Sequence, residues 1–281
     1  HFPTAKETAE QSDVVVMALG ESAVMNGEAA SRTHLGLPDN QLELFRELKQ
    51  LGKPVIVLLS CGRPLVIPEL AEEADALMVI WSPGTEAGNA IADVLLGDVA
   101  PSGKLPMTFP HHVGQIPIHY QSKRTGRPYL GKYDEPLSER VYLSKYRDAP
   151  NEPLYPFGYG LSYTKFELSD LHLSQAFMEP GDKLEVSVTV TNTGLCQGTE
   201  VVQLYISDIK ASITPVSKSL KAFERVTLTP GEGRELKLEL GESDFEMLDK
   251  NMNWVVEPGE FEIFVGVNEV DGLIARLEWS D

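Results

Sequence analysis

The hydrophobic period of the chain changes near residue 162, and this change predicts two domains of different class. Before it, three short runs are apolar throughout, and a segment with helical spacing follows each of them. The runs are SDVVVMALG, PVIVLLSCG and ALMVIWSPG. Buried strands that alternate with helices are typical of a parallel sheet covered on both faces. The first part therefore predicts an α/β domain.

The segments between the apolar runs have the spacing and end signals of helices. PDNQLELFRELKQLGK repeats apolar residues at helical spacing, and Asp39 is the expected N-cap. PLVIPELAEEAD predicts a short helix, and TEAGNAIADVLLGDVAPSG predicts one stopped by glycine and proline. TAKETAEQ, before the first run, is typical of a helix end whose own strand would lie upstream. We therefore expect an α/β domain that is truncated on its N-terminal side.

The rest of the chain follows other patterns. Residues 111–161 are rich in Pro, Gly and Tyr and have no sustained period. After them apolar and polar residues alternate in KLEVSVTVTNTG, EVVQLYISD, RELKLELGE and GEFEIFVGVN. Short alternating strands between turn signals predict an antiparallel β-sandwich of roughly 100 residues. The expected organisation is an α/β domain at 1–120, a connector at 121–161 and an all-β domain at 162–281.

Charge and motif content exclude several classes of partner. The formal net charge of −18 opposes binding to nucleic acid and to anionic membranes. No apolar run approaches the roughly 18 residues that a membrane span needs. His111, His112 and His119 do not match the spacing of a zinc site. We expect no nucleic acid, no membrane, no metal and no other cofactor.

The loop GESAVMNGEAASR, directly after the first apolar run, carries two carboxylates and a cation. In open α/β sheets, ligands bind at the loops that leave the carboxyl ends of the strands. Glu21 and Glu28 each follow a glycine, and Arg32 ends the loop. The residues alone leave two interpretations of Glu28, a catalytic group and a solvated carboxylate. For Glu21 the alternative is a structural role in capping the next turn.

Several long motifs occur in a specific order, beginning with WSPGTEAGNAIADVLLGDVAPSGKLPMTFP and LYPFGYGLSYTKF, and continuing with NTGLCQGTEVVQLYISD, SLKAFERVTLTPGE and WVVEPGEFEIFVG. Together they resemble the C-terminal half of a glycoside hydrolase family 3 enzyme of the bacterial β-glucosidase type. The resemblance covers essentially the whole chain. It implies an α/β sandwich domain with a mostly parallel sheet, followed by a fibronectin type III-like β-sandwich.

The resemblance also implies a function and a partner. Members of the family carry an N-terminal (β/α)8 barrel that supplies an aspartate nucleophile and most contacts to the terminal glucosyl unit. The implied activity is that of a retaining, exo-acting β-glucosidase on β-glucosides or oligosaccharides. A β-xylosidase and a non-catalytic accessory module are the alternatives.

The motifs of that barrel do not occur in this sequence, so the chain alone is expected to be inactive. It should associate with a barrel domain, with a barrel chain or with itself. A periplasmic or secreted location is expected, and a cytoplasmic one is left open.

By the same resemblance, Glu28 occupies the place of the acid/base glutamate, because its spacing to Arg32 is similar to the family's Gly-Glu-x-x-x-Arg pattern. Glu21 is the competing candidate. Arg32 either pairs with one of these glutamates or contacts sugar hydroxyls. A general acid needs a raised pKa, which requires partial burial. Without the barrel that burial is missing, so we expect a solvated Glu28 in this chain.

Four aromatic residues are candidates for stacking on a sugar ring: Trp81, Tyr129, Tyr133 and Tyr155. Packing is the alternative for each of them. Trp81 ends a predicted buried strand, where support of the core or of the rim is the expected role.

Overall fold

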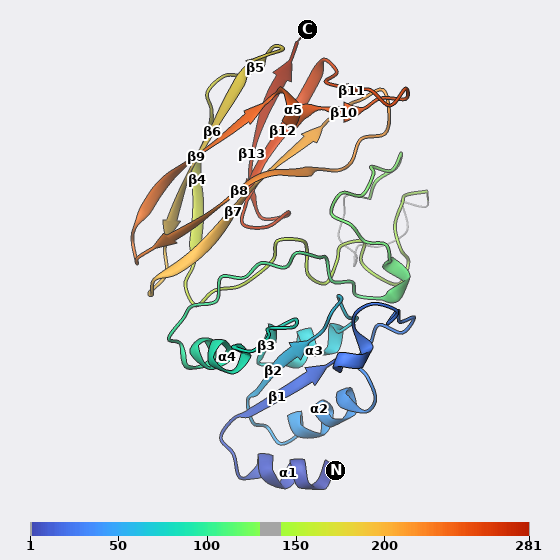
Figure 1. The fold of residues 1–281 in the computed structure, drawn as a ribbon, viewed down its shortest axis with the longest axis vertical. Coiled ribbons are helices and arrows are strands. Elements are labelled where there is room, and N and C mark those ends of the chain that lie inside the picture. Colours follow the sequence, from blue (N-terminus) through green and yellow to red (C-terminus); the bar gives the residue numbers. More distant parts are fainter. Residues whose placement is uncertain (1, 130–141, 281) are drawn as a thin grey trace. The chain divides into compact units, whose positions relative to one another are not determined.

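A computed structural model describes residues 2–129 and 142–280 (Figure 1). The chain forms two compact units. The first consists of His1–Ile91 with Phe109–Pro117, and the second of Ala92–Thr108 with Ile118–Asp281. Residues 92–108 thus belong to the second unit, although the sequence pattern predicts them in the α/β domain. The predicted boundaries at 120 and 161 stay predictions.

The first unit contains a three-stranded parallel sheet, which confirms the prediction from the three apolar runs. The order is β1-β2-β3, with β2 in the centre. Helices and turns join and flank the strands. The elements are α1 (Phe2–Glu10), β1 (Val15–Gly20), the 3₁₀ helix η1 (Ala23–Met25), α2 (Gln41–Lys49), β2 (Val55–Ser60), α3 (Pro68–Glu73), β3 (Ala76–Val79), α4 (Ala87–Leu96), whose last five residues fall in the second unit, and the 3₁₀ helix η2 (Val113–Gln115).

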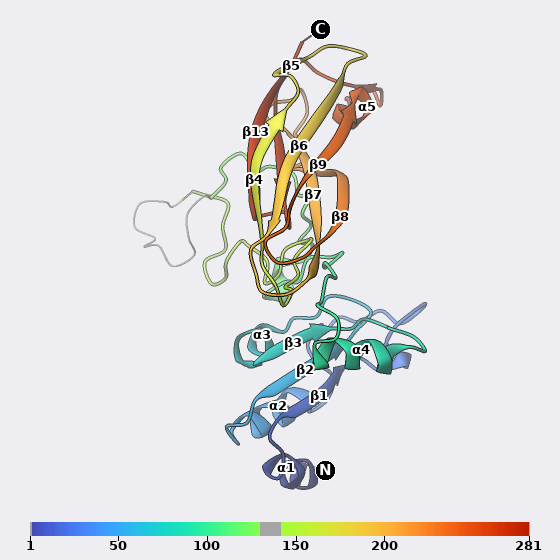
Figure 2. The ribbon, with the colours of Figure 1, turned by 90° about the vertical axis from the view of Figure 1, so that its left-hand side faces the viewer.

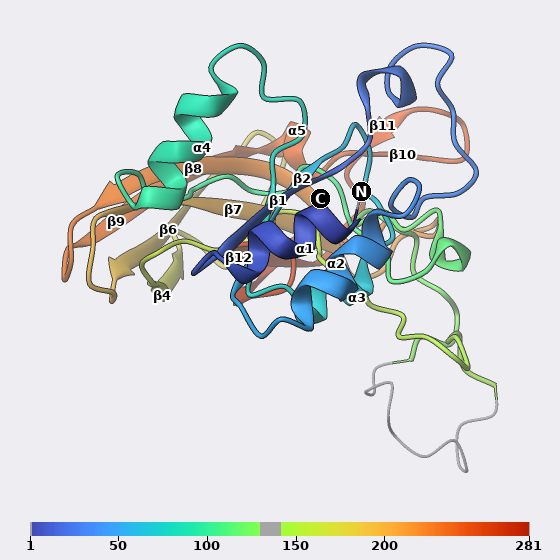
Figure 3. The same cartoon turned by 90° about the horizontal axis from the view of Figure 1, so that it is seen from below.

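The sheet is less covered than the apolar runs predict. On β1, Met17 and Leu19 are buried, whereas Val16 on the strand and Val14 just before it are about half exposed, at 49% and 46%. Helices α1 and α2 lie side by side on one face (Figures 1 and 3). Helix α4 buries none of its residues. Because β1 and β3 are both edge strands, only β2 has the nearly continuous burial that was expected of all three.

The start of α2 differs from the prediction. The N-cap is Asn40 and not Asp39, and its side chain makes no capping hydrogen bond. Asp39 adopts a left-handed conformation with φ of 50°. The side chain of Gln41 fixes this end instead, because it bonds both backbone groups of Gly20, accepting from N at 2.7 Å and donating to O at 2.9 Å. This contact attaches α2 to the carboxyl end of β1.

The second unit is a β-sandwich of two sheets, as predicted. One sheet has the order β5-β13-β12-β7-β8 and the other the order β4-β6-β9 (Figure 2). The elements are β4 (Phe166–Leu173), β5 (Phe177–Met178), β6 (Lys183–Asn192), β7 (Gly198–Asp208), β8 (Ser219–Leu228), β9 (Gly233–Gly241), α5 (Glu242–Phe245), β10 (Met247–Leu248), β11 (Trp254–Val255), β12 (Gly259–Gly266) and β13 (Gly272–Trp279). The inward residues of both sheets form one apolar core, with Val188, Leu204 and Ile263 almost fully buried.

Residues before β4 pack on this sandwich. Leu105 exchanges backbone hydrogen bonds with the segment at 158–159, donating to the carbonyl of Tyr159 and accepting from the N–H of Gly158, each at 2.8 Å. Lys104 forms an ion pair with Glu200 on β7 at 2.7 Å, and both side chains are largely buried. These contacts explain why residues 92–108 belong to the second unit.

Candidate active site

The two predicted glutamates lie on the loop that leaves β1, and the strand end determines where this loop begins. Gly20 has φ of 124°, and a Cβ there would lie 1.8 Å from the carbonyl oxygen of Ser60. Only glycine allows β1 and β2 to approach so closely. The N–H of Glu21 then donates to the same carbonyl at 2.8 Å. Glu21 therefore starts the loop while its backbone is still paired with β2.

Glu21 is a buried anion with three partners. Its side chain is 0% exposed, and it lies 2.5 Å from Nη1 of Arg32 and 3.2 Å from Nε of Arg63. The N–H of Gly62 donates to its second oxygen at 3.2 Å. Burial by itself raises the pKa of this carboxyl, but the hydrogen bonds from Arg32 and Gly62 and the two arginine charges outweigh it and lower the pKa. A general acid needs the opposite shift.

Arg32 and Arg63, which pair with Glu21, also donate hydrogen bonds to backbone carbonyls in and next to the loop. Arg32 also donates from Nη2 to the carbonyl of Gly36 at 3.3 Å. Arg63 donates from Nη2 to the carbonyls of Met25 at 2.7 Å and Ala30 at 2.9 Å. Of the two roles expected for Arg32, the structure contains the ion pair with a glutamate, and that glutamate is Glu21.

Arg63 is a site residue that the sequence pattern did not predict. A signal for it exists, since it follows the second apolar run just as Glu21 follows the first. The carboxyl ends of parallel strands lie at one edge of a sheet, so polar residues after two neighbouring strands come together there.

Glu28 lies in the middle of the loop and is exposed, which agrees with the expectation for this chain. The next residue, Ala29, has φ of 59°, a left-handed conformation that is uncommon for a residue with a side chain. The loop thus presents one exposed carboxylate to solvent and encloses a second one that is neutralised. This arrangement separates the two candidates by environment, although they are close in sequence.

Three of the four candidate stacking residues lie in the described part of the chain, and each contacts another side chain. The ring of Trp81, two residues after β3, packs on buried Phe109 with centroids 5.9 Å apart. Tyr155 stacks on Tyr159 at 5.0 Å, and Nζ of Lys145 lies over the ring of Tyr129 at 4.4 Å. Tyr133 lies outside the described residues. The three described residues have packing partners, and their role in stacking on a sugar stays a hypothesis.

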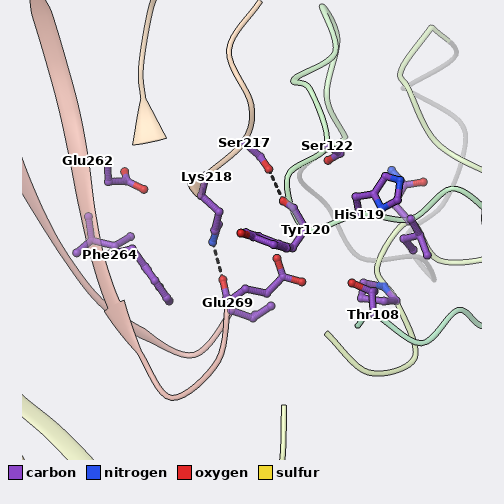
Figure 4. Close-up of a pocket in the computed structure, with 14 residues that line it drawn as sticks. Thr108, His119, Tyr120, Ser122, Ser217, Lys218, Glu262, Phe264 and Glu269 are labelled. Atoms are coloured by element: carbon purple, nitrogen blue, oxygen red, sulfur yellow. Dashed lines mark hydrogen bonds between the residues drawn. The ribbon is translucent and has the colours of Figure 1, made fainter. Parts of the chain in front are cut away.

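A pocket of about 410 Å³ lies in the second unit (Figure 4). Lys218 donates from Nζ to the carbonyl of Glu269 at 2.5 Å, and Oγ of Ser217 donates to the carbonyl of Tyr120 at 2.7 Å. The carboxylate of Glu269 accepts from the N–H of Phe157 at 3.2 Å. Burial raises the pKa of Glu269 and lowers the pKa of Lys218. These polar groups hold the segments at 118–122 and 157 on the sandwich, so they have a structural role in joining the two.

Among the described residues, no helix has both the length and the apolarity to cross a membrane.

Family models match most of the chain. The Glycosyl hydrolase family 3 C-terminal domain matches residues 1–163, and the Fibronectin type III-like domain matches residues 200–269. The first match alone covers more than half of the sequence.

Individual relatives agree with the family models. A periplasmic beta-glucosidase of Salmonella typhimurium is 46% identical over 94% of this chain, and a beta-xylosidase of Formosa agariphila is 40% identical over 95%. The match spans 34% and 35% of these two proteins. The structure of a beta-glucosidase from Listeria innocua in complex with glucose superimposes with a TM-score of 0.93 and 43% identity, covering all of this chain and 38% of that one.

The chain thus spans about a third of the length of the curated relatives it matches. It belongs to glycosyl hydrolase family 3 and corresponds to the C-terminal domain of that family followed by its fibronectin type III-like domain.

Proposed function

We propose that this chain is the C-terminal part of a retaining, exo-acting β-glucosidase and that Glu28 is its acid/base. An aspartate on an N-terminal barrel domain or barrel chain would be the nucleophile. The observation that carries the proposal is the contrast within one loop: Glu28 is exposed and reachable, whereas Glu21 is buried and bound by two arginines. The names of the Salmonella and Listeria relatives support the substrate class.

The chemistry fits an exposed carboxyl on a supported loop. Retaining glycosidases place two carboxyl groups about 5–5.5 Å apart, one on each side of the scissile bond. Glu28 would protonate the leaving oxygen while the aspartate bonds to the anomeric carbon. It would then take a proton from the water that releases the sugar. A barrel surface or a bound sugar that covers Glu28 would raise its pKa, as an acid at neutral pH requires.

Two alternatives remain within this proposal. The 40% identical relative from Formosa agariphila is named a beta-xylosidase. The choice between glucose and xylose would be made by residues that contact the glycone, and we place those on the barrel. The other alternative is an accessory module without a catalytic residue. A periplasmic or secreted location is part of the proposal and is supported by the name of the Salmonella relative.

The first experiment measures intact mass, under denaturing conditions, of the native gel-filtration peak. A second polypeptide of barrel size would indicate a two-chain enzyme, and assays with aryl glucosides would follow on that complex. A peak of several copies of this chain alone would support self-association. A monomer alone would move the assays to the full-length protein.

The decisive variant is Glu28→Gln in the full-length protein or complex. Turnover should fall by about 10²–10⁴-fold, and azide should partly restore it with an activated aryl glucoside. Glu7→Gln is the matched control, because Glu7 is an exposed glutamate on α1. If Glu28→Gln turns over at the rate of the control, Glu28 is not the acid/base, and Glu21 or the accessory-module alternative takes its place. An aryl xyloside in parallel separates the two sugar specificities.

A further inference from the structure

We propose that Arg63 is a positioning residue that fixes the loop conformation presenting Glu28, and that buried Glu21 holds Arg63 in place. The inference rests on the proposed function, since it concerns how the acid/base is positioned. It is argued from a bridging contact: Nη2 of Arg63 donates to the carbonyls of both Met25 and Ala30, at 2.7 and 2.9 Å. These carbonyls lie on either side of Glu28.

This bridging contact fixes the separation of the Met25 and Ala30 carbonyls. Nη2 of a guanidinium carries two hydrogens at a fixed angle, so one nitrogen can hold two carbonyls at a defined separation. The rest of the guanidinium faces Glu21, with Nε 3.2 Å from the carboxylate. Among the described residues Nε has no hydrogen-bond partner, so this second contact acts through charge. An ammonium on a flexible stem cannot reproduce both contacts.

Glu21 makes the arrangement unique. Its carboxylate is removed from water, and in this conformation the loop brings Arg32 to it while the end of β2 brings Arg63 and the N–H of Gly62. A buried ion that loses one partner is strongly unfavourable, so alternative loop conformations are disfavoured. Glu21 therefore acts on Glu28 indirectly, although it does not reach solvent itself.

A close contact adds a second constraint on the same loop. The side chain of Asn26 packs directly on Gly62, where a Cβ would lie 2.3 Å from Oδ1 of Asn26. The absence of a side chain at Gly62 thus allows the part of the loop before Glu28 to pack on the end of β2. A methyl group on residue 62 would displace this part of the loop without removing any charge. The residue offers an independent way to disturb the loop.

The expected consequence is a loss of turnover with little change in substrate binding. A misplacement of about 1 Å at a catalytic group costs up to about 10²-fold in rate. The glycone contacts are proposed for the barrel, so KM should change little. In the full-length protein, Arg63→Lys should lower kcat by roughly 10- to 100-fold and leave KM within about twofold. Arg46→Lys is the control, because Arg46 pairs with Glu69 on the surface of the same unit.

A second measurement tests the loop directly in the chain of 281 residues. Hydrogen–deuterium exchange of residues 22–32 should become at least about tenfold faster in Arg63→Lys and stay unchanged in Arg46→Lys. Gly62→Ala should likewise speed the exchange and lower kcat, and it decides the question if Arg63→Lys does not fold. The inference is overturned if exchange is unchanged, or if exchange rises while kcat does not fall.

These readouts also separate this inference from the proposed function. Failure of the proposed function is seen in Glu28→Gln, whose rate would equal that of its control. Failure of the positioning role is seen when Glu28→Gln loses turnover but Arg63→Lys and Gly62→Ala retain it.

Discussion

The carboxylate of Glu21 lies 2.5 Å from the guanidinium of Arg32, at the other end of the same loop. The pair closes the loop around Glu28 and buries one of its two negative charges. It therefore has consequences for stability as well as for the site.

Glu21→Gln should destabilise the first unit at neutral pH by about 3–5 kcal/mol, because it leaves two partly buried arginines without their counter-ion. The folded-state pKa of Glu21 is lowered from 4.5. The stabilising contribution of the Glu21 carboxylate is therefore complete above pH 4.5. It is lost as the pH falls through the lower pKa of the folded state. The difference from wild type, measured by urea unfolding, should shrink in acid. Glu28→Gln should match wild type within about 0.5 kcal/mol. A constant difference at all pH values would contradict this account.

Lys104→Met should destabilise the second unit more than an exposed ion pair can explain. Lys104 and Glu200 are only 12% and 9% exposed, so the lone carboxylate would stay buried, at a cost of about 3 kcal/mol or more. The double change Lys104→Met with Glu200→Met should recover most of this loss. Lys183→Met is the control, because its pair with Glu239 is exposed and worth about 0–1 kcal/mol. Calorimetric unfolding compares the four proteins, and equal losses in both single variants would refute the prediction.

Cys61 should resist alkylation in the folded chain. It is fully buried, and burial together with the nearby charge of Glu21 raises the pKa of its thiol to about 11. Cys196 is exposed and provides the internal control. Mass spectrometry after iodoacetamide treatment should find Cys196 modified first and Cys61 modified only on unfolding. Comparable rates at the two sites would show that the β2 end opens readily.

Gly20→Ala should be among the most damaging small substitutions in the first unit. The new methyl group would clash with the carbonyl of Ser60, and φ of 124° disfavours any side chain. A loss of about 2 kcal/mol or more is expected, together with a weaker β1–β2 end. Gly88→Ala is the control, since nothing lies within 4 Å of its added Cβ and it is helical. It should be neutral or stabilise by up to about 1 kcal/mol. Thermal unfolding of both variants checks the prediction.

The hydrophobic period determined the fold class and many of the elements. β2, β6, β7, β9 and β12 each coincide with a run selected from the sequence. β4 and β8 each carry an extra residue at a register shift, which interrupts the alternation, and neither was among those runs. A local pattern therefore predicts a strand less well where a bulge breaks its period of two.

The sequence by itself also placed two carboxylates and an arginine at a strand end, where a parallel sheet binds ligands. The residues alone did not distinguish Glu21 from Glu28, since each follows a glycine on the same loop, and it was the resemblance to the family that favoured Glu28. The tertiary structure separates the two by burial and by ion pairing. Arg63 contacts the carbonyl of Met25 across 38 residues of sequence, and it meets the loop because β1 and β2 pair in parallel. Burial and charge at this strand edge depend on distant residues, which no local pattern contains.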